Sequence, residues 1–424
     1  MAHRFKLTRQ ERSWILYDVG NSAFVLVMVT AIMPIFFKDF AAHGIPDAVS
    51  TAHWGFANST ASLILAFLSP ILGTFADYKS LKIKFFTIFL GIGLAFIVLL
   101  TAVNEGQWLL CLGLFVLARV GWAGANVFYD AFIVDVTSRD RMDQISAGGY
   151  AWGYVGSIVP FLIIIAMILS DPEKTGAALP VLRTKIGFLV VAGWWLVFSI
   201  PMIRHVRQTC FIPPSAAPVA DSFRRLGRRF QDIRKHRQTF LFLIAYFFYI
   251  DGVDTIISMS TAYGRDLGFG VPLLIAVILF IQIIAFPFAL LYGHLARSSS
   301  AKTLLLSGIG IYCAITLMAF MLPAITDQTL KKAAFWCIAF LVGSSMGGIQ
   351  ALSRSFYARL IPPEKSAEFF GFYNVFGKFA TITGPFLMGV VGAWAGHSRW
   401  GVLGLLGLFI IGAGMLLHVK DTSV

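Results

Sequence analysis

Long apolar runs separated by short polar segments make up most of this chain of 424 residues. An α-helix rises about 1.5 Å per residue, so about 20 apolar residues cross the roughly 30 Å of hydrocarbon in a bilayer. Runs of that length recur along the whole chain and predict an all-α membrane protein with twelve transmembrane helices. The predicted spans are residues 13–37, 54–76, 83–103, 107–136, 148–170, 185–203, 239–262, 271–292, 303–323, 332–360, 367–395 and 400–418.

Composition and charge agree with this assignment. With 58% hydrophobic and 13% charged residues, the chain does not suit a soluble surface. Its net charge of +13 comes from basic residues dispersed over many short loops, which excludes a nucleic-acid-binding surface. Most of the 34 Lys and Arg residues lie in alternate loops, and cytoplasmic loops carry such an excess, so both termini are predicted to be cytoplasmic. The densest basic cluster, residues 224–237, is expected to contact anionic lipid headgroups.

The central loop divides the chain into two halves of six spans. We predict an N-terminal six-helix bundle at 1–203, a basic cytoplasmic linker at 204–238 and a C-terminal six-helix bundle at 239–424, because the linker is too short for a core of its own. A repeat supports this symmetry. The segment GTFADYKSLK follows the second span, and GHLARSSSAK follows the eighth.

The first copy of this repeat resembles the loop signature of the major facilitator superfamily, G-x-x-x-D-x-x-x-x-K/R. The resemblance implies a gating loop in which the Asp docks on a helix N-terminus and the basic residues make cytoplasmic charge contacts. A Gly permits close helix approach, and a helix dipole stabilises a carboxylate at its N-terminus. The matching residues are Gly73, Asp77, Lys79 and Lys82.

Three longer segments are similar to one branch of that superfamily, which contains the yeast vacuolar amino-acid effluxer linked to autophagy and its bacterial relatives. They are WILYDVGNSAF at 14–24, FYIDGVDTII at 248–257 and a stretch of two helices at 347–385. The resemblance implies the major facilitator fold, with two pseudo-symmetric six-helix bundles, and a solute transporter that works by alternating access.

The chain departs from the pattern of its relatives at four positions. Ser80 stands where the loop signature usually has Gly, and Arg297 takes the Asp position in the second copy. On the fourth span, Asp130 replaces a neutral amide and Asp135 lies near the usual Pro position. The last two differences indicate that the substrate or the coupling differs from that of the eukaryotic member.

Polar residues inside the spans are the candidate binding residues. Asp251 and Asp254 lie in the seventh span, and Asp18 and Asn21 repeat their spacing in the first. An intramembrane acid costs about 2.5 to 3.5 kcal/mol on insertion scales, so these groups must be paired, protonated or hydrated. Asp251 and Asp254 lie deeper along their helix than Asp18, which favours them for a site at the membrane midplane.

Helical spacing places further polar residues on shared faces. They are Arg119, Asn126 and Asp130 on the fourth span, Gln350 and Arg354 on the tenth, and Asn374 and Lys378 on the eleventh. We expect these side chains to line a water-filled cavity, which the first and seventh helices line in the resembled superfamily. The alternative is a set of interhelical ion pairs with no role in transport.

The chemistry of these residues suggests a solute and a coupling ion. Mixed acidic and basic groups suit a zwitterion, such as an amino acid, or an organic anion. Two acids one turn apart in a partly desolvated site raise each other's affinity for protons, so Asp251 or Asp254 is the hypothetical proton site. A drug or lipid exporter of the same superfamily is the alternative within transport. A solute sensor that does not transport, or an intramembrane enzyme, is more remote.

No cofactor or metal is expected. The His residues are dispersed over both sides, no HExxH or CxxC occurs, and no GxxxxGK motif with a following Ser or Thr follows a strand. We therefore do not expect an enzyme. The predicted partners are a small-molecule substrate, protons and anionic lipid, and the chain is expected to be a monomer. The first helix is expected to be retained, since no cleavage site follows the basic N-terminus. Short loops without appended domains suggest the bacterial inner membrane, with a vacuolar or lysosomal membrane as the alternative.

Overall fold

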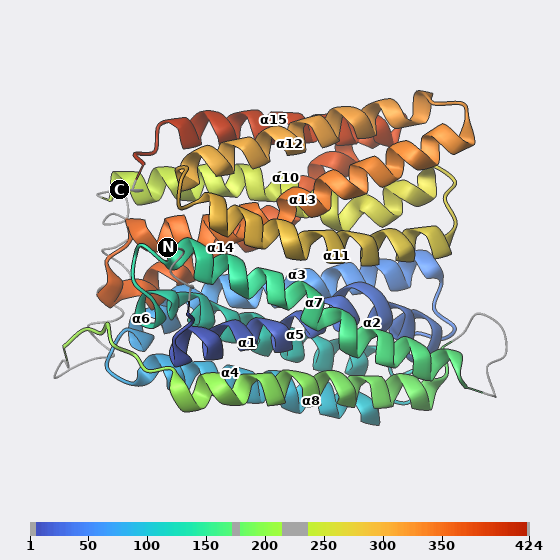
Figure 1. Cartoon of the computed structure of the whole chain (residues 1–424). Coiled ribbons are helices and arrows are strands. Elements are labelled where there is room, and N and C mark those ends of the chain that lie inside the picture. The colour runs from blue at the N-terminus through green and yellow to red at the C-terminus, as the bar shows by residue number, and fades with distance from the viewer. Residues whose placement is uncertain (1–5, 172–178, 214–235, 422–424) are drawn as a thin grey trace. The chain divides into compact units, whose positions relative to one another are not determined.

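The computed structural model describes residues 6–171, 179–213 and 236–421. In this part of the chain, twelve helices are long and apolar enough to cross a membrane, which confirms the predicted all-α architecture and the number of spans (Figure 1). The basic cluster at 224–237 lies outside the described residues, apart from its last two residues.

The first span, Arg9–Ala41, is built from several pieces. It joins α1 (Arg9–Phe24), a π-helical stretch Val25–Ala31, α2 (Ile32–Phe36) and a second π-helical stretch Phe37–Ala41. The other spans are α3 (Asp47–Ala76), α4 (Leu81–Leu99), α5 (Trp108–Ala131), α7 (Met142–Leu169), α8 (Val181–His205), α10 (Arg237–Asp266), α11 (Val271–Leu295), α12 (Ala301–Met321), α13 (Gln328–Leu360), α14 (Ser366–Trp394) and α15 (Ser398–Leu417).

Local chemistry explains how the first span begins and why it is irregular. Thr8 caps α1 by accepting a hydrogen bond from the backbone N–H of Glu11, whose carboxylate accepts one from the Thr8 N–H in return. Further along, Pro34 lacks a backbone N–H, and a π-helical stretch lies on each side of its short helix. The span is therefore not a regular α-helix along its whole length.

The predicted span 107–136 is wrong as a single helix. The structure ends α5 at Ala131 and continues with the short α6 (Ile133–Val136). At the break, the Phe132 N–H is shared between the carbonyls of Phe128 and Tyr129, and the Asp135 N–H donates to the Phe132 carbonyl three residues back, so the backbone tightens there. The segment after the break carries Asp135, which is buried.

The chain forms two compact units. Unit 1 consists of Met1–Thr137, Trp152–Val219 and Pro363–Gly371, and unit 2 of Ser138–Ala151, Ala220–Pro362 and Phe372–Val424. The first turns of α7 therefore belong to unit 2, and the first turns of α14 belong to unit 1. All contacts described below lie within one unit or the other.

In unit 1, α4 packs along α5 and α1 packs along α8. The closest approach is between α4 and α5, where a Cβ on Gly121 would collide with the backbone of Gly93. Large aromatic side chains fill the core beside them, including the fully buried Trp14 and Trp195.

In unit 2, α11 packs along α13, α10 along α15, and α12 against both α13 and α15. The aromatic rings of Tyr312 on α12 and Phe409 on α15 meet in its core, at 5.6 Å between centroids. This packing holds α10, which carries Asp251 and Asp254, among α13, α14 and α15.

Candidate functional site

Asp18 and Asn21 form a shielded polar network in unit 1. The Asp18 carboxylate accepts hydrogen bonds from the Tyr129 hydroxyl at 2.6 Å and the Asn21 amide at 2.9 Å. Asn21 Oδ1 in turn accepts from Trp122 Nε1 at 3.1 Å and Asn126 Nδ2 at 3.4 Å. Asp18 and Asn21 are buried, so this network ties α1 to α5 and offers little surface to a solute.

The predicted stripe on α5 is more accessible. Arg119, Asn126 and Asp130 are each half-buried. The Arg119 guanidinium lies deep among the side chains of unit 1, yet part of its surface remains open. Within the described residues it makes no hydrogen bond or ion pair, so unit 1 presents a guanidinium that an anion could bind.

Asp251 is sealed inside unit 2. It is 0% exposed, and its Oδ1 accepts hydrogen bonds from the Gly384 N–H at 2.7 Å and from Thr255 Oγ1 at 3.5 Å. A Cβ on Gly384 would collide with both side chains, so glycine is what lets Asp251 reach the α14 backbone. The other oxygen, Oδ2, is buried without a hydrogen-bond partner among the described residues. Asp251 thus joins α10 to α14 next to Pro385.

Asp254, three residues further on, has different surroundings. It is half-buried, forms a side-chain hydrogen bond with Gln350 of α13, and interacts electrostatically with Lys378 of α14. Gln350, Lys378 and the nearby Asn374 are half-buried too. The structure therefore brings four of the predicted residues toward one accessible polar cluster, which we call the Asp254 cluster: Asp254, Gln350, Asn374 and Lys378.

Arg354 does not share the accessibility of Gln350, its neighbour one turn earlier. It is 2% exposed, and its guanidinium donates to Ser146 Oγ at 2.9 Å and the Ser146 carbonyl at 3.0 Å. The same group lies 4.4 Å from the centroid of the Tyr150 ring. Sequence reasoning missed Ser146 and Tyr150, because neither is charged and no spacing rule connects the start of α7 with α13.

In the loop after α3, Asp77 makes the contact that the family resemblance implies. Its carboxylate accepts from the backbone N–H groups of Ala367 at 2.8 Å and Glu368 at 3.0 Å, in the first turn of α14. A Cβ on Gly73 would collide with the Ala367 carbonyl. Burial raises the pKa of Asp77 to about 8, while the charge of Lys82 pulls it down.

The two lysines of this loop, Lys79 and Lys82, differ in burial and in their partners. Lys82 is 0% exposed and its Nζ lies 2.7 Å from Asp135 Oδ2 and 2.8 Å from Ser366 Oγ. Lys79 is exposed, with its Nζ 5.6 Å from the centroid of the Phe211 ring. Sequence reasoning missed the partnership of Lys82 with Asp135, because no spacing rule connects the start of α4 with α6.

The second copy of the loop makes a similar contact in unit 2 with different chemistry. Arg297 donates to Gln144 Oε1 at 2.6 Å, and a Cβ on Gly293 would collide with Ala147, so this loop packs on the first turns of α7. Asp143 on the same turn pairs with Arg359 at 2.8 Å. Arg297 therefore binds the side-chain amide of Gln144 on α7, whereas Asp77 binds backbone N–H groups at the start of α14.

No group of three or more His, Cys, Asp or Glu side chains within the described residues could hold a metal ion. The candidate residues instead comprise paired charges and an amide in unit 2 and, in unit 1, a guanidinium without a hydrogen bond or ion pair within the described residues.

Comparison with known proteins identifies the relatives of this chain. The family model described as "Vacuole effluxer Atg22 like" matches residues 50–140 and 134–423. The "Uncharacterized MFS-type transporter YxiO" of Bacillus subtilis is 46% identical over 419 residues, which cover 99% of this chain and 96% of YxiO. "Autophagy-related protein 22-1" of Sclerotinia sclerotiorum is 28% identical over 300 residues, which cover 63% of this chain but only 49% of the fungal protein.

Solved structures show the same fold. The human organic anion transporter MFSD10 gives a TM-score of 0.71 at 14% identity, covering 96% of this chain and 99% of that chain. The proton:xylose symporter XylE gives a TM-score of 0.73 at 10% identity, covering 98% of this chain and 96% of that chain. At such low identities the likeness establishes the major facilitator fold and says nothing about the solute.

Proposed function

The chain belongs to the Atg22-like vacuole effluxer family of the major facilitator superfamily and is a multi-pass membrane protein, and we propose that it transports a small zwitterionic solute by alternating access. An amino acid is the solute class that this proposal favours. The observation that best supports this proposal is the Asp254 cluster, in which an acid, a base and an amide are accessible together in unit 2.

The charges of this cluster favour a zwitterion for a physical reason. A buried ion pair that loses one partner leaves an uncompensated charge, which costs about 3 to 5 kcal/mol. A zwitterion avoids that cost, since its ammonium can face Asp254 while its carboxylate faces Lys378. A solute with a single charge would leave one of the two without a partner. Gln350 can donate and accept, so it suits either end of the solute.

The same reasoning links a proton to the solute. The ammonium of a zwitterion at Asp254 would favour the ionised carboxylate, so the solute and a proton would compete for this acid. Binding of the solute and of the proton would then be coupled reciprocally. Asp251 is a weaker candidate for this role, because it is fully buried and already accepts two hydrogen bonds.

An organic anion is the second candidate solute, and Arg119 is the observation that favours it. A guanidinium deep in unit 1 that lacks a hydrogen bond or ion pair within the described residues is costly unless water or an anion contacts it. Arg binds carboxylates in a bidentate manner, so an organic acid would suit this position.

The distribution of Lys and Arg supports an orientation with both termini in the cytoplasm. We propose the bacterial inner membrane as the location, since the relative with the most extensive match reported above is bacterial. A vacuolar membrane is the alternative location, because the matching family is described as a vacuole effluxer family and includes fungal relatives.

Counterflow in proteoliposomes tests the proposed function. Vesicles holding the full chain are loaded with unlabelled amino acids or organic acids, and the entry of the same labelled solute is followed. The wild type should accumulate label transiently. Lys378→Gln should lose at least tenfold in initial rate, whereas Lys332→Gln, an exposed lysine at the start of α13, should not. The proposal is wrong if no solute of either class exchanges, or if Lys378→Gln exchanges as fast as Lys332→Gln.

A further inference from the structure

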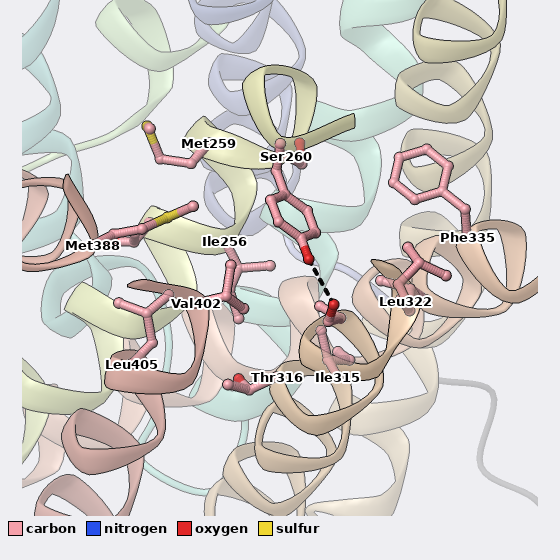
Figure 2. A pocket seen from close by; sticks show the side chains of 14 residues that line it. Ile256, Met259, Ser260, Ile315, Thr316, Leu322, Phe335, Met388, Val402 and Leu405 are labelled. Carbon is pink, nitrogen blue, oxygen red and sulfur yellow. Dashed lines mark hydrogen bonds between the residues drawn. The ribbon is translucent and has the colours of Figure 1, made fainter. Parts of the chain in front are cut away.

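Unit 2 contains an apolar pocket, partly open to its surroundings, among α10, α12, α13, α14 and α15 (Figure 2). One end of its wall is Thr255, which directly follows Asp254 on α10 and donates to Asp251. The wall residue Met388 lies ten residues beyond Lys378 on α14, a rise of about 15 Å along the helix. A small solute at the Asp254 cluster would not reach this far end of the pocket.

The wall of the pocket is apolar. Figure 2 shows aliphatic, thioether and aromatic side chains facing the space, and they include Ile256, Met259, Ile315, Phe335, Met388 and Leu405. An apolar wall of this kind favours apolar ligands over water, because water needs two to four polar partners.

The hydroxyl groups in the wall are already engaged. The Tyr263 hydroxyl donates to the Ala319 carbonyl at 2.7 Å, and Thr316 donates to the Tyr312 carbonyl at 2.8 Å. Ser260 donates to the Ile257 carbonyl at 2.9 Å, and Thr255 donates to Asp251 at 3.5 Å. Their protons are therefore not offered to the pocket, which favours an apolar ligand further.

The pocket lies close to the ends of the helices that form it. Val402 in its wall is one turn from Ser398, where α15 begins, and Phe335 is about 10 Å from the start of α13. Trp400 is 38% exposed in that first turn of α15, and Trp is enriched at membrane interfaces. The pocket is therefore at the depth where the first part of a lipid chain would lie.

A basic group stands at this end of the pocket. Arg399, three residues before Val402, packs its guanidinium 5.6 Å from the ring centroids of both Phe320 and Trp400. Its Nε is buried and has no hydrogen-bond partner among the described residues. Phe320 directly follows the wall residue Ala319, so the ring that the guanidinium packs against belongs to the same turn of α12 as the wall.

From these features we propose that the pocket binds an anionic amphiphile, with one alkyl chain in the apolar space and its acid group at Arg399. A fatty-acid anion and an anionic phospholipid share this chemistry. The apolar wall accounts for the chain, and the unused Nε–H accounts for the acid. The site does not depend on which solute the Asp254 cluster binds.

The alkyl-chain contact is tested with the full chain in phosphatidylcholine nanodiscs, using dansyl-undecanoic acid as the fluorescent probe and dodecanoate as the competitor. Ala319→Leu places three extra carbons in the pocket and should lower the affinity for dodecanoate at least tenfold. Ala314→Leu, on the exposed face of the same helix, should leave it unchanged. Equal affinities in the two variants would overturn the proposal.

The acid contact is tested by changing the head group of the ligand. Arg399→Gln should weaken dodecanoate about tenfold and leave dodecanol unaffected, whereas Lys332→Gln should change neither. An equal effect of Arg399→Gln on both ligands, or none on either, would refute the role of Arg399.

Native mass spectrometry of the protein released from bilayers of phosphatidylglycerol and phosphatidylcholine distinguishes a bilayer phospholipid from a free fatty acid as the ligand. If the wild-type protein keeps phosphatidylglycerol bound and the Arg399→Gln protein does not, the occupant is a bilayer lipid. Binding of dodecanoate without retained phosphatidylglycerol identifies a free fatty acid. If neither binds to the wild type, the proposal is wrong.

Discussion

Removing the charge of Lys82 should destabilise unit 1 strongly. The Lys82 ammonium and the Asp135 carboxylate are 2.7 Å apart and both side chains are 0% exposed. Breaking such a pair by removing one partner costs about 3 to 5 kcal/mol, because the other charge stays buried. We expect Lys82→Met to lie at the lower end of that range. Asp135 would still accept from the N–H groups of Thr209 and Cys210, each at 2.7 Å.

The reverse change should cost more. In Asp135→Asn the ammonium of Lys82 would keep the Ser366 hydroxyl at 2.8 Å, but it would lose the carboxylate charge that lies 2.7 Å away. The double variant Lys82→Met/Asp135→Asn removes both charges and should therefore be more stable than Asp135→Asn alone. Such non-additivity is typical of residues in direct contact.

Scanning fluorimetry of the purified protein measures both effects. A loss of 3 kcal/mol corresponds to a decrease in Tm of about 6 °C or more for a unit of this size. Lys79→Met, which removes an exposed lysine from the same loop, should lower the Tm by less than about 2 °C. The reasoning fails if Lys82→Met and Lys79→Met have the same Tm. It also fails if the decrease in Tm of the double variant equals the sum of the decreases of Lys82→Met and Asp135→Asn.

Three further predictions concern other contacts of the fold. Gly384→Ala should lower the Tm by several degrees, since its methyl group would collide with Asp251, whereas Gly389→Ala has free space and should not; equal Tm values would contradict the close approach. Ser80 has a φ of 64°, in the left-handed region, so Ser80→Gly should stabilise the protein by about 1 kcal/mol, and an unchanged or lower Tm would count against this. Burial raises the pKa of Asp77 to about 8 from its ordinary 3.8, so the stability that its protonated form contributes is present at low pH and is lost as the pH rises through about 8. The Tm of Asp77→Asn should therefore depend less on pH between pH 5 and pH 8 than that of the wild type, and identical slopes would refute this.

Much of the architecture could be predicted from the sequence because membrane crossing imposes a length on every apolar run. The spans are recognisable without any knowledge of packing. The contact of Asp77 with the start of α14 could also be anticipated, since the loop signature carries a definite physical role for its carboxylate.

The break after α5 could not be predicted in the same way. Residues 107–136 contain no Pro, and nothing in their local pattern ends the helix after Ala131. The break accompanies the burial of Asp135 against Lys82, a residue from another helix. Tertiary pairing of this kind overrides local periodicity.

The different environments of Asp251 and Asp254 also depend on distant residues. The sequence presents them as two equivalent acids one turn apart. In the structure, Gly384 gives Asp251 a backbone N–H to bind, whereas Asp254 meets Gln350 and Lys378. Spacing along one helix indicates which residues share a face, but the partners opposite that face decide which acid stays accessible.

The proposed coupling through Asp254 is tested most directly by uphill transport under an imposed pH gradient. Proteoliposomes of the wild type, Asp251→Asn and Asp254→Asn receive the solute identified by counterflow, and its accumulation is measured as the gradient is varied. The account predicts that the wild type accumulates solute in proportion to the gradient and that Asp254→Asn does not. If Asp254→Asn retains uphill, pH-dependent accumulation, the coupling through Asp254 is contradicted, and if Asp251→Asn retains it as well, neither acid of the pair carries the coupling.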